Sequence, residues 1–88
     1  MASITIMHSH KNLWAAHAIA KENDGAEVRE HDPQGFITIE APKRLHVVRA
    51  IVETAFGKDI EDSAWQSFTL NKRGRLTKAT MDEIVIED

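Results

Sequence analysis

The chain contains short stretches in which hydrophobic and polar residues alternate, a pattern that predicts half-buried β-strands. In residues 3–7, isoleucines alternate with Ser3 and Thr5. Near the carboxyl end, Ile84 and Ile86 share one face in the same way. On this basis we predict strands at residues 3–7, 26–30, 36–40, 75–80 and 83–87, and an extended segment at 67–70.

Two other segments place apolar residues at helical spacing. Residues 13–22 are rich in alanine, and their apolar stripe consists of Trp14, Ala15, Ala18 and Ile19. Residues 45–56 are predicted as the second helix, with an apolar face of Val47, Val48, Ile51, Val52 and Ala55. Asn12 is a candidate cap for the first helix, and Gly57 can end the second in a left-handed conformation.

The connections are short, which favours antiparallel neighbours. Turn-forming residues at 31–35 separate two predicted strands, so these strands are expected to form a hairpin. Residues 71–74 are interpreted as a second hairpin loop, in which Gly74 takes special backbone angles. Asp62 or Ser63 could cap one short helical turn between the second helix and this loop.

The predicted element order is β-α-β-β-α-β-β-β, and the predicted fold class is α+β. Two amphipathic helices would pack on antiparallel twisted sheets. The 88 residues fit one compact domain spanning residues 1–88. A domain of this size has a modest core and little room for a deep, enclosed active site.

The chain has no cysteine, which excludes disulfides, thiolate metal ligands and a thiol nucleophile. No signal peptide precedes the first predicted strand, and no apolar run approaches the roughly 20 residues of a membrane span. We therefore expect a cytoplasmic protein without membrane contact.

Charge is unevenly distributed along the chain. The formal net charge is −3, which argues against nucleic-acid binding as the main role of the protein. Residues 21–32 are rich in acidic residues. Residues 72–78 contain no acidic residue and four basic ones: Lys72, Arg73, Arg75 and Lys78. Such a dipolar surface suits steered docking on another protein, although solvated surface charge explains it equally well.

Candidate chemistry is sparse. His8 and His10 could chelate a metal from one side of an extended segment, but polar loop histidines are the simpler interpretation. The acid clusters at 59–62, 82–83 and 87–88 have no apolar pocket to separate their pKa values, so solvated charge is expected. Trp14 and Trp65 are core candidates, with a partner-facing role as the alternative.

Several local strings resemble the effector, or coupling, proteins of bacterial multicomponent monooxygenases, which include the regulatory subunits of phenol hydroxylases, toluene monooxygenases and soluble methane monooxygenase. The phenol hydroxylase type is the most similar. The resemblance rests on residues 22–28, the Ile-x-Ala-Pro-x-Arg-Leu string at 39–45, the Val-Glu-x-x-x-Gly-x-Asp string at 52–59, Gly74, and the acidic residues 82–83. It covers roughly residues 4–87 in one order.

This resemblance implies a partner and no chemistry of the chain's own. The partner is the diiron hydroxylase component, and the effector carries no metal, flavin or other cofactor and is not an enzyme. It would modulate substrate access, oxygen activation and electron coupling in the hydroxylation of hydrocarbons or aromatics, and be a monomer when free. The family's late hairpin maps onto the predicted hydroxylase interface: Leu70, Asn71, Lys72, Arg73, Gly74 and Arg75.

Two other functional classes stay open at this point. One is an unrelated α+β module that binds a protein or a small ligand, which a concave pocket with convergent polar groups would favour. The other is a small enzyme or metal-binding protein built on His8 and His10. Within the interface loop, Gly74 and Arg75 match the family, while residues 70–72 depart from the small polar residues of several members.

Overall fold

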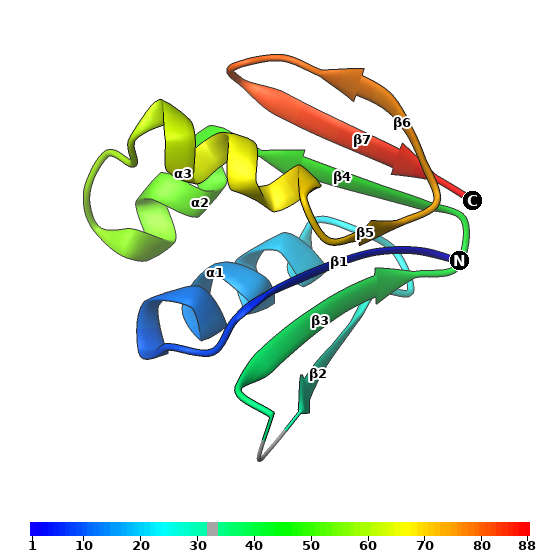
Figure 1. Ribbon diagram of the computed structural model, residues 1–88, viewed down its shortest axis with the longest axis horizontal. Coiled ribbons are helices and arrows are strands. Elements are labelled where there is room, and N and C mark those ends of the chain that lie inside the picture. The colour runs from blue at the N-terminus through cyan, green and yellow to red at the C-terminus, as the bar shows by residue number, and fades with distance from the viewer. Residues whose placement is uncertain (32–33) are drawn as a thin grey trace.

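The computed structural model describes residues 1–31 and 34–88, and its strands form two antiparallel sheets (Figure 1). Sheet A has the order β2-β3-β1-β5 and sheet B the order β4-β7-β6. The strands of sheet A are β1 (Ala2–Met7), β2 (Glu27–His31), β3 (Phe36–Ala41) and β5 (Lys72–Arg73). Those of sheet B are β4 (Arg44–Val48), β6 (Arg75–Ala79) and β7 (Glu83–Glu87).

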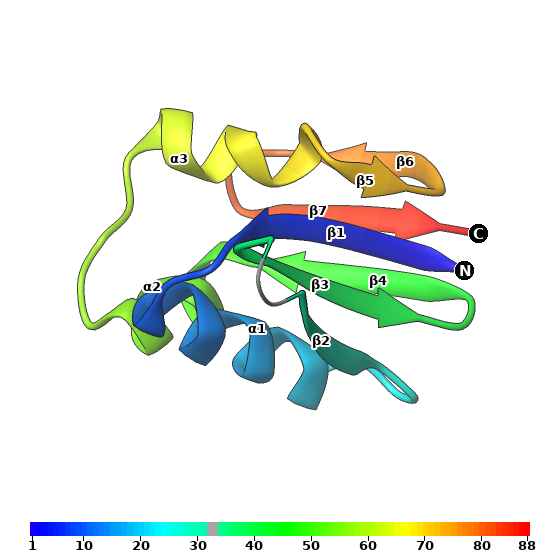
Figure 2. The ribbon, with the colours of Figure 1, turned by 60° about the horizontal axis from the view of Figure 1, so that its bottom comes forward.

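The helices lie on two sides of these strands. Figure 2 shows α1 and α2 on one side, and α3 on the other. A short 3₁₀ helix, η1, continues directly from α3. The helices are α1 (His10–Lys21), α2 (Arg49–Phe56), α3 (Asp62–Gln66) and η1 (Ser67–Thr69). The predicted α+β class, with helices packed on antiparallel sheets, is confirmed.

One hydrophobic core joins the two sheets and the helices. Successive side chains of a strand point to opposite faces of the sheet, which places Ile4 of β1 and Ile37 and Ile39 of β3 on the inner face of sheet A. All three have no exposed surface. Ile84 and Ile86 of β7 are buried from sheet B in the same way. The inner faces meet the apolar sides of the helices, which contribute Ala15, Ala16, Ile19, Val52, Trp65 and Phe68.

The predicted strands at 3–7, 26–30, 36–40, 75–80 and 83–87 are confirmed as β1, β2, β3, β6 and β7, within a residue or so at their ends. The hairpin of β2 and β3 is also confirmed, because these strands pair antiparallel with Glu30 opposite Ile37. The predicted turn at 31–35 includes residues 32–33, which lie outside the described part of the chain.

The predicted helix at 45–56 is wrong in its first turn, because residues Arg44–Val48 form strand β4. Leu45 and Val47 are fully buried, and the residues between and after them are only partly buried, which is a period of two. In β4, Leu45 lies opposite Ile86 and Val47 opposite Ile84. Pairing with β7 therefore outweighs the helical spacing, and α2 begins only at Arg49.

Segment 67–70, predicted as extended, instead continues α3 as helix η1. The hydroxyl of Ser67 donates to the carbonyl of Ala64 at 2.6 Å, and that of Thr69 to the carbonyl of Gln66 at 2.9 Å. These bonds to carbonyls three residues earlier keep the chain in a helical turn. Phe68 is thereby buried, with its ring 5.7 Å from that of Trp65.

Helix α1 differs from its prediction at its start and in its buried face. Ser9, not Asn12, is the cap, and its hydroxyl accepts the Asn12 backbone N–H at 3.0 Å. The buried residues are Ala15, Ala16 and Ile19, so the true stripe is rotated away from Trp14. Small alanines let the helix approach its neighbours closely, and the indole of Trp14 points outward with 57% of its surface exposed.

Candidate docking surface

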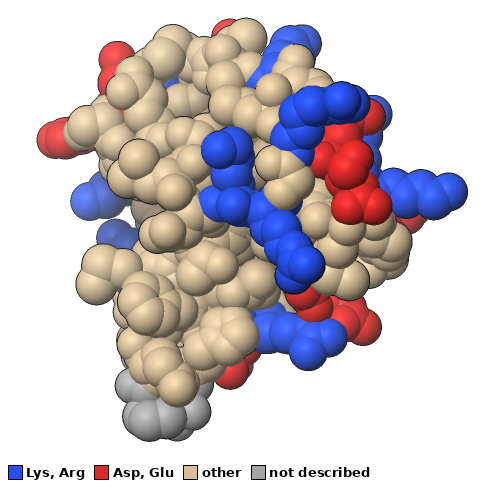
Figure 3. All heavy atoms as spheres, turned by 45° about the vertical axis from the view of Figure 1, so that its right-hand side comes forward, with Lys and Arg blue, Asp and Glu red and all other residues tan. Residues whose placement is uncertain are grey.

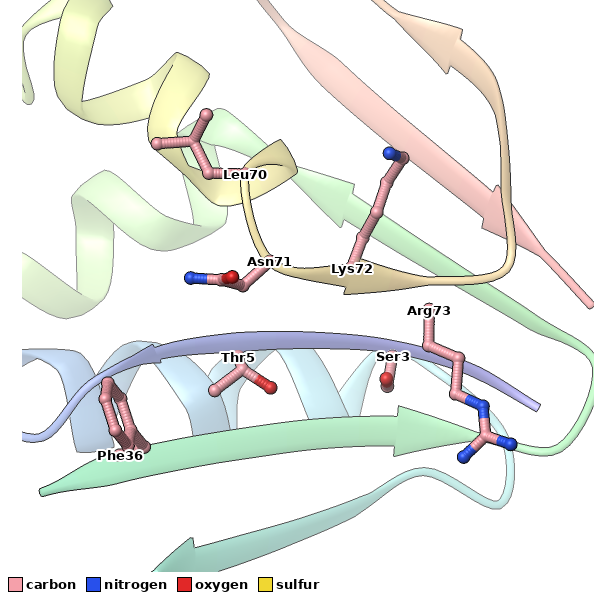
Figure 4. Close-up of a pocket in the computed structure, with 7 residues that line it drawn as sticks. All are labelled: Ser3, Thr5, Phe36, Leu70, Asn71, Lys72 and Arg73. Atoms are coloured by element: carbon pink, nitrogen blue, oxygen red, sulfur yellow. The ribbon is translucent and has the colours of Figure 1, made fainter. Parts of the chain in front are cut away.

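The predicted interface loop connects the two sheets (Figure 4). Lys72 and Arg73 form β5, which pairs with β1 so that Arg73 lies opposite Ser3. Arg75 then begins β6, which pairs with β7. The interpretation of residues 71–74 as a hairpin loop is therefore wrong, because β5 and β6 pair with different strands instead of each other.

The loop is held at both ends by backbone contacts. Before β5, the carbonyl of Asn71 accepts the backbone N–H of Thr5 at 2.8 Å. After β5, Gly74 has φ 108° and passes so close to β7 that an added Cβ would lie 2.7 Å from the carbonyl oxygen of Glu87. Only glycine fits at this crossing. These contacts anchor the loop to β1 on one side and to β7 on the other.

The cations of this loop are free to bind a partner. Lys72, Arg73 and Arg75 are exposed, and they form no ion pair with other residues in the described ranges 1–31 and 34–88. Figure 3 shows lysine and arginine side chains in a band across one face, next to a broad surface without charged residues. The loop therefore presents positive charge beside neutral surface.

The terminal residue Asp88 lies close to this loop. Its carboxylate accepts a hydrogen bond from the amino-terminal amine. This contact holds the pKa of Asp88 below its usual value, with a smaller contribution from the positive charge of Arg73. Asp88 thus interacts mainly with the amino terminus and less with Arg73.

Beside the cations lies a hollow of about 510 Å³ with an apolar side (Figure 4). Leu70, 78% exposed, borders it above Asn71, and Phe36 borders it at the start of β3. A second hollow of about 380 Å³ shares Leu70 and Asn71 with the first and reaches Met7. Sequence reasoning did not select Met7 or Phe36, although both stand on the outward side of strands that the alternation had identified.

The two histidine candidates do not converge on a metal site. Nε2 of His8 lies 2.8 Å from a carboxylate oxygen of Glu30, while His10 begins α1. Within residues 1–31 and 34–88, no three histidine, cysteine or acidic side chains are grouped so that they could hold a metal ion. The polar interpretation of His8 and His10 fits this arrangement.

The acidic clusters at 59–62 and 82–83 take part in surface ion pairs. Asp62 binds the guanidinium of Arg49 at 2.9 Å. Glu83 contacts Lys78 and also His46, whose Nε2 lies 2.7 Å away. Lys78 first, and then His46, hold the pKa of Glu83 below its usual value. These are structural pairs between neighbouring elements.

The two tryptophans have opposite positions. Trp65 is 1% exposed in the core, and its indole N–H donates to the carbonyl of Thr80 at 2.8 Å. Trp14 is exposed on α1, which lies on the other side of the strands from α3 (Figure 2). The core prediction is therefore confirmed for Trp65 and wrong for Trp14.

Comparisons with known proteins give a consistent result. The model of the MmoB/DmpM family matches residues 1–87, and no curated protein matches the chain. Two solved chains, both from structures described as a phenol hydroxylase–regulatory protein complex, share the fold. The first has a TM-score of 0.73 at 23% identity, covering 99% of this chain and 97% of the other. The second has a TM-score of 0.70 at 22% identity, covering 99% and 98%.

No helix in the described residues is long and apolar enough to cross a membrane. The two solved chains, at these identities, show the fold alone, whereas the family match extends over nearly every residue. That match overturns the alternative of an unrelated α+β module. The resemblance found in the sequence is confirmed, and the chain belongs to the MmoB/DmpM family.

Proposed function

We propose that the chain is a regulatory protein that acts in the cytoplasm and docks on the diiron hydroxylase of a multicomponent monooxygenase. In this role it modulates substrate access, oxygen activation and the coupling of electrons to product, and it carries no cofactor and no catalytic residue. The proposal rests above all on the family match over residues 1–87. The two solved complexes with a similar fold, which pair a regulatory protein with phenol hydroxylase, support it.

The interface loop supports the same role. Leu70, the three cations and the backbone of Asn71 lie together on a segment that is anchored to both sheets. An anchored loop loses little conformational freedom on binding, so more of its contact energy appears as affinity. Its charge can also accelerate the encounter with an acidic surface.

A protein of this kind regulates its partner through differential binding. It shifts the hydroxylase toward one conformation only if it binds that conformation more tightly than the other. A rigid docking surface suits this task, because it fits one arrangement of the partner's surface and binds the other arrangements less tightly. The chain needs no reactive group for such an effect.

The test is a reconstitution with the cognate hydroxylase and reductase. Adding the chain is expected to raise product formed per electron consumed, in proportion to complex formation measured by calorimetry. Arg73→Ala and Arg75→Ala should each weaken binding by roughly two- to fivefold, since an exposed charge pair contributes up to about 1 kcal/mol.

Lys58→Ala is the matched control, because Lys58 is an exposed cation in the connection between α2 and α3. Its removal should leave affinity and coupling unchanged. If the chain neither binds the hydroxylase nor changes its coupling, the proposed function is wrong. If Arg73→Ala, Arg75→Ala and Lys58→Ala all bind the hydroxylase with the same affinity, the chain docks through another surface.

A further inference from the structure

The interface loop is too small to be the whole docking surface. Stable interfaces use about 20–30 residues from each partner, whereas the loop has six: Leu70, Asn71, Lys72, Arg73, Gly74 and Arg75. The remaining contact area must come from surface next to the loop. The two hollows that border Leu70 and Asn71 show where that surface is.

Two large apolar side chains lie along these hollows on the outward face of sheet A. Met7 is 71% exposed and Phe36 is 42% exposed. They are opposite each other in the pairing of β1 with β3, so their side chains stand on the same face. Phe36 and Leu70 border one hollow, Met7 and Leu70 border the other, and Thr5 lies in both. Met7, Phe36 and Leu70 thus stand around two adjoining hollows on one surface, and Thr5, Leu70 and Asn71 line both hollows.

The charges beside this surface indicate the chemistry of its occupant. At its edge stand the cations of β5, and Lys72 and Arg73 line the same hollow as Phe36. Three polar side chains of the face bond to one another: Thr5 with Thr38 at 3.0 Å, and Thr38 with His31 at 2.9 Å. The large apolar side chains and the cations of β5 complement an acidic surface with exposed aliphatic side chains.

We propose that Met7 and Phe36, together with Leu70, are the apolar anchor of the docking surface, and that an acidic surface of the hydroxylase with exposed aliphatic side chains covers them. This inference rests on the proposed function and extends it from the loop to sheet A. Residues at the centre of an interface, packed and shielded from water, contribute most of the binding energy. The anchor therefore carries the affinity, and the cations of the loop orient the encounter.

The experiment compares Met7→Gln and Phe36→Thr with wild type in binding to the cognate hydroxylase. Both positions are on the surface of strands, and threonine is well suited to a strand, so the variants should fold; circular dichroism and thermal unfolding verify this. Each change is expected to weaken binding by about tenfold or more, as for a hot-spot side chain. Trp14→Ala is the control, because it removes an exposed aromatic side chain from α1, and it should change affinity by less than about twofold.

A second measurement follows solvent access directly. Methionine oxidation, stopped early and read by mass spectrometry, should be slowed at Met7 in the complex but not at Met81, which is 40% exposed in the connection between β6 and β7. One outcome would overturn the proposed anchor and leave the proposed function standing. In it, Arg73→Ala weakens binding, Met7→Gln and Phe36→Thr do not, and Met7 oxidises at the same rate in the free chain and in the complex. If wild type does not bind the hydroxylase, both fall together.

Discussion

Single residues decide how the interface loop is held, and Gly74 is the most constrained of them. It combines a positive φ of 108° with a contact to the backbone of β7, where the nearest atom is a carbonyl oxygen that cannot move aside easily. The loop crosses from sheet A to sheet B at this residue. Its conformation therefore determines both local stability and the position of the adjacent cations.

Gly74→Ala is expected to be markedly destabilising. The left-handed backbone alone costs roughly 1–2 kcal/mol, and steric overlap with β7 adds about 1–3 kcal/mol. Gly35→Ala is the matched control, since Gly35 has φ 80° but nothing within 4 Å of its added Cβ. Urea unfolding measures both variants, and equal losses would contradict the close approach at Gly74.

Glu83 is expected to make stability depend on pH. Its pKa is lowered by Lys78 and, to a lesser degree, by His46. A carboxyl whose pKa is lower in the folded state stabilises the fold above its unfolded-state pKa and loses that contribution as the pH falls through the folded-state pKa. Wild type should therefore lose more stability than Glu83→Gln as the pH falls from neutrality into the acid range.

Thermal unfolding at a series of pH values tests this. Glu61→Gln serves as the comparison, because Glu61 is exposed and forms no ion pair with another residue of the described ranges. Parallel pH profiles for wild type and Glu83→Gln would show that the Lys78 and His46 contacts do not act on stability.

At the scale of elements, α3 shows how a short segment is kept in place by tertiary contacts. It has five residues, far fewer than the roughly 12–15 that an isolated helix needs for even marginal stability. Its buried side chain is Trp65, which packs edge-on against Phe68 and bonds to the carbonyl of Thr80. This residue ties α3 to the end of β6, where the connection to β7 begins.

Trp65→Phe should lower the free energy of unfolding by about 1–3 kcal/mol, because the smaller ring leaves space in the core and removes the hydrogen bond to Thr80. Trp14→Phe should change it by less than about 0.5 kcal/mol, as for most surface substitutions. Chemical denaturation followed by circular dichroism distinguishes the two variants. Equal stabilities would mean that Trp65 does not fix α3.

At the scale of the whole molecule, charge is segregated although the net charge is −3. Arg29 of β2 pairs with Glu27 and Glu40, so its positive charge is matched by carboxylates at that edge of sheet A. The cations of β5 and the start of β6 have no such partners among the described residues. One side of the molecule therefore attracts acidic surfaces despite the overall negative charge.

Affinity for the hydroxylase is consequently expected to fall as salt is raised, since exposed charges are screened over about 10 Å at 0.1 M ionic strength. Arg73→Gln should flatten this dependence, whereas Lys58→Gln should not. Calorimetric titrations at several salt concentrations provide the measurement. A steep salt dependence that both variants keep would place the electrostatic contact elsewhere on the surface.

Much of the fold was predictable because it is encoded locally. Five strands, the first helix, the β2–β3 hairpin and the glycine at the end of α2 all follow from periodicity and turn chemistry within a few neighbouring residues. The candidate loop followed from its cations and its resemblance to the family. Met7 and Phe36 were missed, because a single exposed apolar residue carries no signal until its strand partner is known.

The amino-acid sequence by itself determined the fold class, the family and the segment that presents the cations, since these depend on patterns and strings read along the chain. The tertiary structure alone decided that residues Arg44–Val48 form a strand and that the interface loop joins two sheets. It also decided that Met7, Phe36 and Leu70 share one surface. The physical reason is the same in each case: strand pairing brings together residues that are distant in sequence. At residues 44–48, the free energy of that pairing also outweighs the local preference of the chain for a helix.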